Sequence, residues 1–483
     1  MATVLHPAEV RSFDELLIGG RWVQPSSDRR IVSISPVTED AIAHVPEAQP
    51  ADIDAAVAAA RRAFDEGPWP RMAPAERAAA LRRIRDEIDA RIPELANAFT
   101  AEIGTPITLS EGFLAGALTM YSAAADALEQ FSFEEDRAAA GGTGRIIREP
   151  IGVVAAIVPW NAPVGNASIK LAPALAAGCT VVLKPAPEGA ANAMMLAEAL
   201  AAAGLPDGVI SVAPAGREVG EHLVRHPGVD KVSFTGSTAA GKRVMSICAE
   251  RIARVTLELG GKSPAIIADD VAVNDLVPGL VMSGIQHSGQ VCAALTRILV
   301  PRRRHDEIVA ALAAEYRTLK VGDPFDRDTQ IGPLVAERQR DAVEAKVQHA
   351  IDDGIQVAVG GRRPAAFDRG WYFEPTLFAG VDNSSRIAQE EIFGPVQVVI
   401  PFDDVEDAIR IANDTPYGLS GAVYANDHEL ADHIARRVRT GQMWINNWGM
   451  CVTEPFGGYK QSGLGREGGA EGIAAYLETK FVG

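Results

Sequence analysis

Short apolar runs rich in β-branched residues alternate with alanine-rich segments of helical length through the middle of the chain. An apolar run of this kind predicts a buried strand, and an alanine-rich segment predicts a helix. The expected strands are 152–159, 180–184, 208–213, 231–236 and 254–261, and the expected helices are one ending near 177, then 191–204, 217–226 and 237–250. This alternation predicts parallel strands joined by right-handed crossovers, which is a doubly wound α/β sheet.

A second series of strands and helices begins near residue 262 and predicts a second α/β lobe. Its expected strands are 264–269, 297–302, 396–402, 421–426 and 442–446, and its expected helices are 305–320 and 404–414. The residues before about 125 are expected to be mostly helical, with helices over 51–67, 74–104 and 121–133. Charged residues and a glycine pair break this pattern over 131–150, which indicates an exposed connector or hairpin.

The composition is that of an acidic globular protein. The 483 residues include 46 Lys and Arg against 63 Asp and Glu, a formal net charge of −17. This charge gives no electrostatic reason to bind nucleic acid or an anionic membrane, so we expect neither partner. The four cysteines form no CxxC pair and residues 1–17 contain no signal-peptide core, which predicts a cytoplasmic protein. The uncharged run 151–169 contains Pro159 and Pro163, which favours a strand and turn over a membrane helix.

Several short patterns have structural explanations that compete with functional ones. Residues 463–468 match GxGxxG but follow no expected strand, so they are a poor dinucleotide fingerprint. Residues 236–242 nearly match a P-loop, but Arg243 stands where Ser or Thr would bind Mg²⁺. The strand, glycine turn and helix start there could still hold a phosphate or pyrophosphate, or could be a tight turn alone. No metal-ligand spacing appears, so we expect no catalytic metal, and we expect His287 to be a packed helix residue rather than a base.

Three side chains suited to acyl chemistry lie at the ends of expected elements. Cys292 stands at an expected helix start, where the dipole could stabilise a thiolate, although a lone cysteine is often structural. Glu258 ends a strand, where apolar surroundings would make it a general base, unless it pairs with Lys262. Asn161 lies in a stiff turn and could donate to an oxyanion or satisfy its own backbone. Together, a thiol, a carboxylate and an amide donor describe acyl chemistry through a thioester.

Eight segments occur in one order over most of the chain. They are VPWNAP (158–163), VVLKPAP (181–187), FTGSTAAG (234–241), LELGGKSP (257–264), GQVCAALTR (289–297), EEIFGPV (390–396), NDTPYGLSGAVY (413–424) and PFGGYKQSGLGRE (455–467). In content and order they resemble the NAD(P)-dependent aldehyde dehydrogenase superfamily, of the hydrolytic type that does not acylate CoA. The chance occurrence of eight ordered motifs is negligible, so this resemblance outweighs the alternatives at single residues.

The resemblance implies a three-part subunit that forms a homodimer or homotetramer. A Rossmann-like NAD(P)-binding domain is expected at 1–129 and 150–260. An α/β catalytic domain is expected at 261–461. A small β oligomerisation arm is expected at 130–149 and 462–483.

The resemblance also implies residue roles. Cys292 would attack the aldehyde, Asn161 would hold the oxyanion with the Cys292 backbone N–H, and Glu258 would activate the water that hydrolyses the thioester. Lys170 and Glu467 match a proton-relay pair. The cofactor residues implied are Val158, Pro159, Trp160, Lys184, Ala186, Pro187, Gly216, Gly220, Phe234, Gly236, Ser237, Leu259, Gly260, Gln339, Glu391 and Phe393. The substrate-pocket residues implied are Ala162, Gly165, Asn166, Val291, Ala293, Cys451 and Phe456.

Two departures from the family pattern bear on specificity. NAD-preferring relatives often have an acidic residue three positions after the motif lysine, and this chain has Pro187 there with Glu188 one position later. We expect NAD as the cofactor, with NADP as the alternative. Small or polar residues follow the oxyanion asparagine at Ala162, Gly165 and Asn166, which favours larger aromatic or branched aldehydes over short ones.

Three rival functions remain at this point. A CoA-acylating aldehyde dehydrogenase would pass the acyl group to CoA, but such relatives typically lack the base at Glu258. A non-catalytic protein on the same scaffold would not need Cys292, Glu258 and Asn161 together. A P-loop NTPase would need the missing Mg²⁺ ligand at Arg243.

Overall fold

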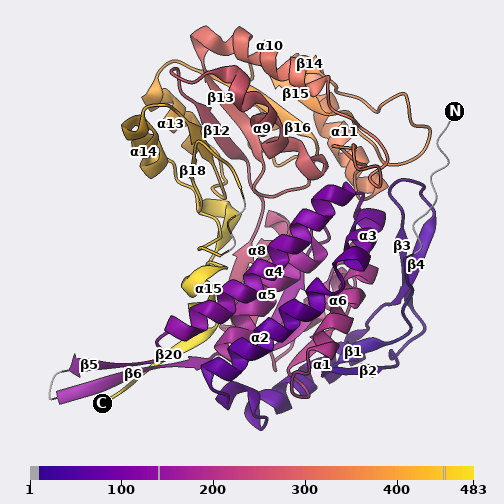
Figure 1. Cartoon of the computed structure of the whole chain (residues 1–483), viewed down its shortest axis with the longest axis vertical. Coiled ribbons are helices and arrows are strands. Elements are labelled where there is room, and N and C mark those ends of the chain that lie inside the picture. Colours follow the sequence, from indigo (N-terminus) through magenta and orange to yellow (C-terminus); the bar gives the residue numbers. More distant parts are fainter. Residues whose placement is uncertain (1–9, 140–141, 450, 452) are drawn as a thin grey trace.

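The computed structural model describes residues 10–139, 142–449, 451 and 453–483. Part of the segment 1–17, where we expect no signal peptide, therefore lies outside the described residues. The same holds for the first glycine of the pair at 141–142. Two large sheets, each covered by helices, form the two lobes in Figure 1. Apart from β19 (Gly463–Leu464), the strands of the first sheet precede residue 261 and those of the second follow it, and the two sheets confirm the α/β class.

The first sheet has eight strands in the order β19-β11-β10-β7-β8-β9-β1-β2, and β11 to β9 run parallel. The strands are β1 (Leu16–Ile18), β2 (Arg21–Val23), β7 (Val153–Val158), β8 (Thr180–Pro185), β9 (Ile210–Val212), β10 (Lys231–Thr235), β11 (Arg254–Glu258) and β19 (Gly463–Leu464). Side chains of β7 alternate between two apolar clusters: Val154 packs with helices on one face, and Val153 packs with helices on the other. The sheet is therefore doubly wound, as the alternating sequence predicts.

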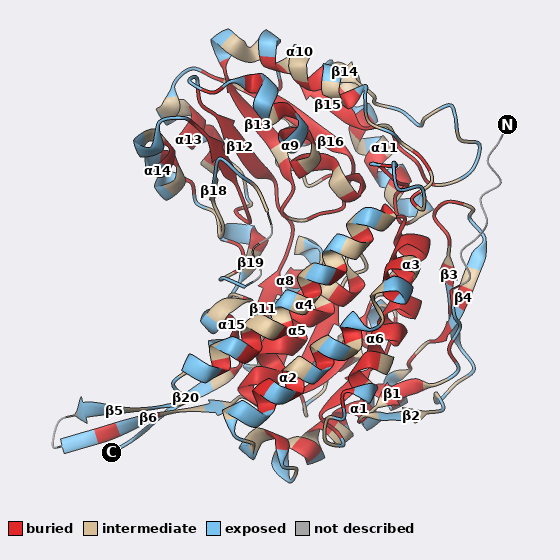
Figure 2. Ribbon diagram, viewed as in Figure 1, coloured by how far each residue is buried: buried red, intermediate tan, exposed pale blue. Residues whose placement is uncertain are grey.

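Helices cover both faces of this sheet. One cluster includes α2 (Pro74–Asp89), α4 (Ile107–Gln130), α5 (Pro163–Ala177) and α6 (Ala190–Ala202). The other includes α1 (Pro50–Asp65), α7 (Arg217–Arg225) and α8 (Thr238–Ala249). Figure 2 shows the buried residues concentrated on the sheet and on the helix sides that face it. In the described part of the chain, no helix is both long enough and apolar enough to cross a membrane.

The second sheet has seven strands in the order β14-β15-β16-β13-β12-β17-β18. They are β12 (Ser263–Ile267), β13 (Leu295–Pro301), β14 (Gln356–Val359), β15 (Thr376–Ala379), β16 (Val396–Phe402), β17 (Ala422–Tyr424) and β18 (Trp444–Ile445). The helices of this lobe are α9 (Val273–Ile285), α10 (His305–Tyr316), α11 (Glu337–Asp352), α12 (Arg386–Gln389), α13 (Val405–Asn413) and α14 (His428–Arg437). The strands expected from β-branched runs are present, although several are shorter than predicted.

A three-stranded sheet projects from the first lobe as an arm (Figure 1). The hairpin of β5 (Glu134–Ala139) and β6 (Gly142–Pro150) confirms the hairpin expected over 131–150. The C-terminal strand β20 (Leu477–Val482) pairs antiparallel with β6. The tail 462–483, which was expected to join the arm, does so only in part. Strand β20 joins the arm, whereas β19 pairs with β11 of the first sheet. Helix α15 (Gly469–Ala474) lies between these two strands in sequence.

The expectation of a mostly helical N-terminal region is wrong for residues 16–46. Two strand pairs precede the first helix, β1 with β2 and β3 (Arg30–Ile34) with β4 (Ala41–Pro46). Gly19 and Gly20 both have positive φ, which allows the tight β1–β2 turn. The helix expected over 74–104 is divided into α2 and α3 (Ile92–Ile103), because Pro93 begins a new helix.

Candidate active site

Two cavities meet at Cys292. The cavity between α4 and α5, here called the α4 cavity, has a volume of about 210 Å³ and includes Cys292 in its wall. The cavity at the N-terminus of α8, here called the α8 cavity, has a volume of about 270 Å³ and includes the same residue. The other residues common to both walls are Asn161, Asn166 and Thr235. A group attached to the thiol could therefore be reached from both sides.

Cys292 lies in a turn just before β13, not at the start of a helix. The preceding residues form a short 3-10 segment (Gln286–Gly289) in which His287 and Ser288 have positive φ. Burial raises the pKa of the Cys292 thiol to about 12, and the nearby carboxylates of Glu391 and Glu258 act in the same direction. The expected stabilisation by a helix dipole is therefore wrong, and in the isolated chain this thiol is protonated near neutral pH.

Glu258 is the last residue of β11, and its side chain is buried. Neither carboxylate oxygen has a hydrogen-bond partner among the described residues. Burial raises the pKa of Glu258 well above its ordinary value, and the charge of Glu467 adds to this shift. The alternative of an ion pair with Lys262 is wrong, because the buried Lys262 ammonium also lacks a described hydrogen-bond partner. Glu258 thus has the properties of a carboxylate that takes a proton more readily than an ordinary glutamate.

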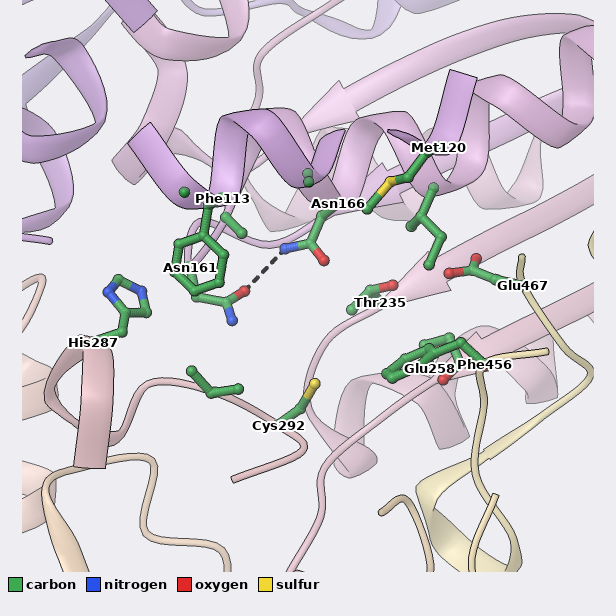
Figure 3. A pocket seen from close by; sticks show the side chains of 16 residues that line it. Phe113, Met120, Asn161, Asn166, Thr235, Glu258, His287, Cys292, Phe456 and Glu467 are labelled. Atoms are coloured by element: carbon green, nitrogen blue, oxygen red, sulfur yellow. Dashed lines mark hydrogen bonds between the residues drawn. The ribbon is translucent and has the colours of Figure 1, made fainter. Parts of the chain in front are cut away.

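The amide of Asn161 is oriented by two hydrogen bonds. Its Nδ2 donates to the backbone oxygen of Gln290 at 2.9 Å, and its Oδ1 accepts from Asn166 Nδ2 at 3.1 Å. An asparagine amide has two N–H donors, so the second remains available. Figure 3 shows the pair between α5 and the Cys292 loop. The alternative of an asparagine that satisfies only its own turn is therefore wrong.

Lys170 and Glu467 come together although 297 residues separate them. The Lys170 ammonium donates to Glu467 Oε1 at 2.5 Å, and both side chains are buried. Ser233 Oγ contacts both, at 3.2 Å from Lys170 Nζ and 3.0 Å from Glu467 Oε1. Glu467 and Glu258 also line the α4 cavity. This network therefore lies within reach of a proton released in the cavity.

The predicted cofactor residues fall into two groups. One group lines the α8 cavity: Pro159, Trp160, Gly236, Ser237, Leu259, Gly260, Gln339, Glu391 and Phe393. The other lies outside its described wall: Val158, Lys184, Ala186, Pro187, Gly216, Gly220 and Phe234. Within this second group, Lys184 Nζ donates to the backbone oxygen of Ala215 at 2.7 Å, and a Cβ on Gly220 would lie 3.4 Å from the Lys184 side chain.

The α8 cavity combines a helix N-terminus with a buried carboxylate. Ser237 caps α8, and its hydroxyl accepts from the Ala240 amide. Glu391 Oε1 accepts from the Gly261 amide at 3.1 Å, and burial raises the pKa of Glu391 to about 7. A Cβ on Gly260 would overlap the Glu391 carboxylate, so this glycine permits the close approach. The cavity is suited to an elongated ligand with phosphate and hydroxyl groups.

The predicted pocket residues are mostly in the wall of the α4 cavity. Ala162, Gly165, Asn166, Val291 and Phe456 line it. Two others are not among its described lining residues: Ala293 packs in the apolar cluster behind Val291, and Cys451 lies near Thr453, with 3.5 Å between Sγ and Oγ1.

The sequence analysis missed the contribution of α4. The missed lining residues are Gly112, Phe113, Gly116, Met120, Ile169, Thr235 and His287. A spacing of four between Gly112, Gly116 and Met120 places them on one face of the helix, and this spacing was the available signal. His287 is packed, as expected, but in a 3-10 segment rather than a regular helix.

The remaining patterns have structural roles. Within 463–468, Gly463 and Leu464 form the edge strand β19, and Leu464 pairs there with Leu257 of β11. At the near P-loop, the Gly236 amide donates to the Glu258 backbone oxygen, which connects β10 to β11. Across the described ranges, no group of three or more His, Cys, Asp or Glu side chains is arranged to hold a metal ion.

Comparisons with known proteins identify the family. The model of the aldehyde dehydrogenase family matches residues 22–482. The chain is 44% identical to geranial dehydrogenase of Castellaniella defragrans over 97% of this chain and 98% of that protein. An aldehyde dehydrogenase of Mycobacterium tuberculosis in complex with NAD+ is 46% identical, with a TM-score of 0.96 and 98% of each chain covered. Aldehyde dehydrogenase C of Pseudomonas syringae, a cysteine variant with NAD+ and octanal, is 41% identical, with a TM-score of 0.94 over 99% of this chain and 97% of that one. The chain belongs to the aldehyde dehydrogenase family, whose members are NAD(P)-dependent oxidoreductases.

Proposed function

We propose that this enzyme oxidises apolar aldehydes larger than short aliphatic ones, aromatic or branched, to carboxylic acids with NAD+. The observation that carries the proposal is the position of Cys292 in the walls of both cavities. An aldehyde in the α4 cavity and a nicotinamide in the α8 cavity would approach the same sulfur from different sides.

The residues of the α8 cavity fit NAD+. The free amides at the start of α8 suit the pyrophosphate, and the Glu391 carboxylate suits ribose hydroxyls. Lys184, whose pKa burial lowers to about 8, is proposed to contact the adenine ribose. When bound, the cofactor accepts the hydride on its nicotinamide ring. Relatives with solved structures are described with NAD+, which supports NAD over NADP.

The chain's own residues account for acylation. The Cys292 thiol gives up its proton to solvent water as its sulfur adds to the aldehyde carbon, and the carbonyl oxygen becomes an oxyanion. The second N–H of Asn161 and the Cys292 backbone amide hold this oxyanion. Its negative charge drives departure of a hydride from the same carbon, which leaves a thioester on Cys292.

Hydrolysis completes the cycle. Glu258, whose pKa is raised by burial, takes a proton from water as the water attacks the thioester. The carbon–sulfur bond then breaks, and the carboxylic acid is released. The proton on Glu258 leaves through the Glu467–Lys170 network, which lies in the same cavity wall. A water route needs no CoA, which separates this proposal from the CoA-acylating alternative.

The wall of the α4 cavity supports a large apolar substrate. Phe113, Met120 and Ile169 supply apolar surface, while Gly112 and Gly116 leave the helix wall without side chains. A Cβ at either glycine would meet no heavy atom within 4 Å; Gly112 is exposed and Gly116 is half-buried, so the cavity opens toward the surface beside them. One relative is named for geranial, a branched aldehyde, and another is described in complex with octanal, a long straight-chain aldehyde, and both support a substrate larger than short aliphatic aldehydes.

The test is the formation of NADH and NADPH with aliphatic, aromatic and terpenoid aldehydes, with and without CoA. We expect NADH with the larger aldehydes, independent of CoA, and no turnover in Cys292→Ala. A strict preference for acetaldehyde would overturn the substrate assignment. A requirement for CoA would overturn the hydrolytic route, and an active Cys292→Ala would overturn the thioester.

The assembly is a second part of the proposal. We propose a cytoplasmic homodimer or homotetramer built through the arm. The strand β20 carries exposed Phe481 and Val482, which a neighbouring subunit would cover. Light scattering of the purified chain tests this, and a monomer at micromolar concentration would contradict it.

A further inference from the structure

We propose that His287 makes the α4 cavity selective for aldehydes with a hydroxyl group remote from the aldehyde carbon, an inference that rests on the proposed function. His287 lines this cavity, and its side chain is buried at 1% exposure. Its Nε2 makes no hydrogen bond of ordinary geometry among the described residues, although the Asn161 backbone lies close enough to act on the pKa of the ring. A buried polar atom without a partner is costly, so a partner supplied by the substrate explains its presence.

The imidazole is held in place on its other side. Its Nδ1 lies 3.0 Å from the buried hydroxyl of Thr105. The rings of Phe99 and Phe113 pack edge-on against it, with centroids 5.9 and 5.8 Å away. The ring therefore cannot turn Nε2 toward another partner without losing these contacts.

The charge state suits recognition of a neutral group. Burial lowers the pKa of His287 to about 4, so the imidazole is neutral at physiological pH. A neutral imidazole has one N–H donor and one acceptor nitrogen, and the hydrogen bond with Thr105 sets which of these faces the cavity. A substrate hydroxyl satisfies Nε2 in either case, since it both donates and accepts.

The position of His287 within the cavity indicates where the hydroxyl belongs. Figure 3 shows His287 on the opposite side of the cavity from Glu258 and Glu467, with Cys292 between them. Phe113 lines the wall beside this histidine, with the two ring centroids 5.8 Å apart. A substrate bound to the thiol would thus extend apolar carbon past Phe113 and meet His287 Nε2 at its far part.

The experiment compares matched substrates. We would measure kcat/KM for 3-phenylpropanal and 4-phenylbutanal, and for their analogues with a ring hydroxyl or methoxy group at each position. The saturated linkers keep the ring substituent from changing the reactivity of the aldehyde. The variants are His287→Leu, which removes the hydrogen bond, and His287→Gln, which retains a polar side chain at the same positive φ.

We expect one hydroxylated analogue to exceed its parent by on the order of tenfold in the wild-type enzyme. This ratio should fall to about one in His287→Leu and be partly kept in His287→Gln. If the methoxy analogue at the same position also exceeds its parent in kcat/KM, Nε2 is the hydrogen-bond donor, because a methoxy oxygen can only accept. Thr105→Val should lower the ratio because it frees the ring.

Three results would overturn the inference. One is the absence of a favoured hydroxyl at any position or length, and another is an unchanged ratio in His287→Leu. The third is an equal loss for parent and hydroxylated substrates in both variants, which would mark His287 as a packing residue. Failure of the wild-type enzyme to oxidise either parent would instead contradict the proposed function itself.

Discussion

The glycines of the α4 cavity wall and those of the Gly260–Gly261 turn beside Cys292, here called the closed wall, differ in what surrounds them. On α4, a Cβ at Gly112 or Gly116 would meet nothing within 4 Å. Around the thiol, a Cβ on Gly260 would overlap Glu391, and one on Gly261 would overlap the Cys292 backbone oxygen. The wall beside the reacting atoms is closed to any side chain, whereas the α4 wall is open. Glycine therefore permits close packing around the catalytic residues on one side, and leaves room for the substrate on the other.

The largest expected effect follows from filling the closed wall. Gly261→Ala would push the Cys292 backbone away, because the obstacle is main chain rather than a flexible side chain. We expect kcat/KM to fall by roughly 10²-fold or more, as for other small displacements of catalytic groups. The matched variant Gly116→Ala, on the open wall, should lose far less. Equal losses in steady-state kinetics would remove the distinction between the walls.

A second large effect should come from Glu258. Glu258→Gln keeps the shape of the side chain but removes the base, and general-base catalysis contributes roughly 10²–10⁴-fold. We expect a burst of NADH followed by slow turnover, because acylation precedes the hydrolysis that Glu258 assists. A loss of the burst itself in stopped-flow measurements would place the role of Glu258 before the thioester.

The pH dependence of the same pair of proteins gives a further check. The pKa of Glu258 is raised, so its basic form is lost as the pH falls through that raised value. Wild-type hydrolysis should therefore increase with pH at values above the titration range of an ordinary carboxylate. The thioester hydrolysis rate of Glu258→Gln should lack this rise. An identical profile in both proteins would assign the titration to another group.

The closed wall was the more predictable of the two from sequence. Its glycines lie in motifs beside Glu258 and Cys292, and β-branched runs located the strands that position them. The helix expected at Cys292 was wrong because positive φ at His287 and Ser288 turns the chain there, which apolar periodicity does not indicate. Local pattern also missed β1, which pairs antiparallel with β9, a strand distant in sequence.

The open wall was not predicted, for a physical reason. In the sequence, Gly112 and Gly116 are only weak helix formers. Their contribution to the cavity wall is evident only from the tertiary structure beside α4. The contact of Lys170 with Glu467 likewise depends on tertiary structure across 297 residues. Only the resemblance to the family placed Lys170 and Glu467 in the site, and the role of this pair in proton transfer stays a prediction.

Filling the open wall should change specificity rather than abolish chemistry. Gly116→Leu would place a side chain in the α4 cavity without displacing described atoms near its Cβ. We expect the ratio of kcat/KM for 3-phenylpropanal to that for propanal to fall by roughly tenfold or more, the scale set by added carbon in an apolar pocket. The comparison uses both aldehydes under the same conditions with NAD+. An unchanged ratio would show that large substrates lie elsewhere.

The smallest effect should be on stability and should have the opposite sign. A glycine inside a helix costs about 1 kcal/mol relative to alanine, and Gly112 lies within α4 with space for a methyl group. Gly112→Ala should therefore slow hydrogen exchange of the α4 amides by about fivefold, which corresponds to that free energy. Gly261→Ala should give no such gain, since its methyl group overlaps backbone. If Gly112→Ala stabilises α4 and also lowers activity with large aldehydes, the glycine is retained for substrate space at the expense of helix stability. If it stabilises α4 with no change in substrate preference, the open wall begins at Gly116 rather than at Gly112.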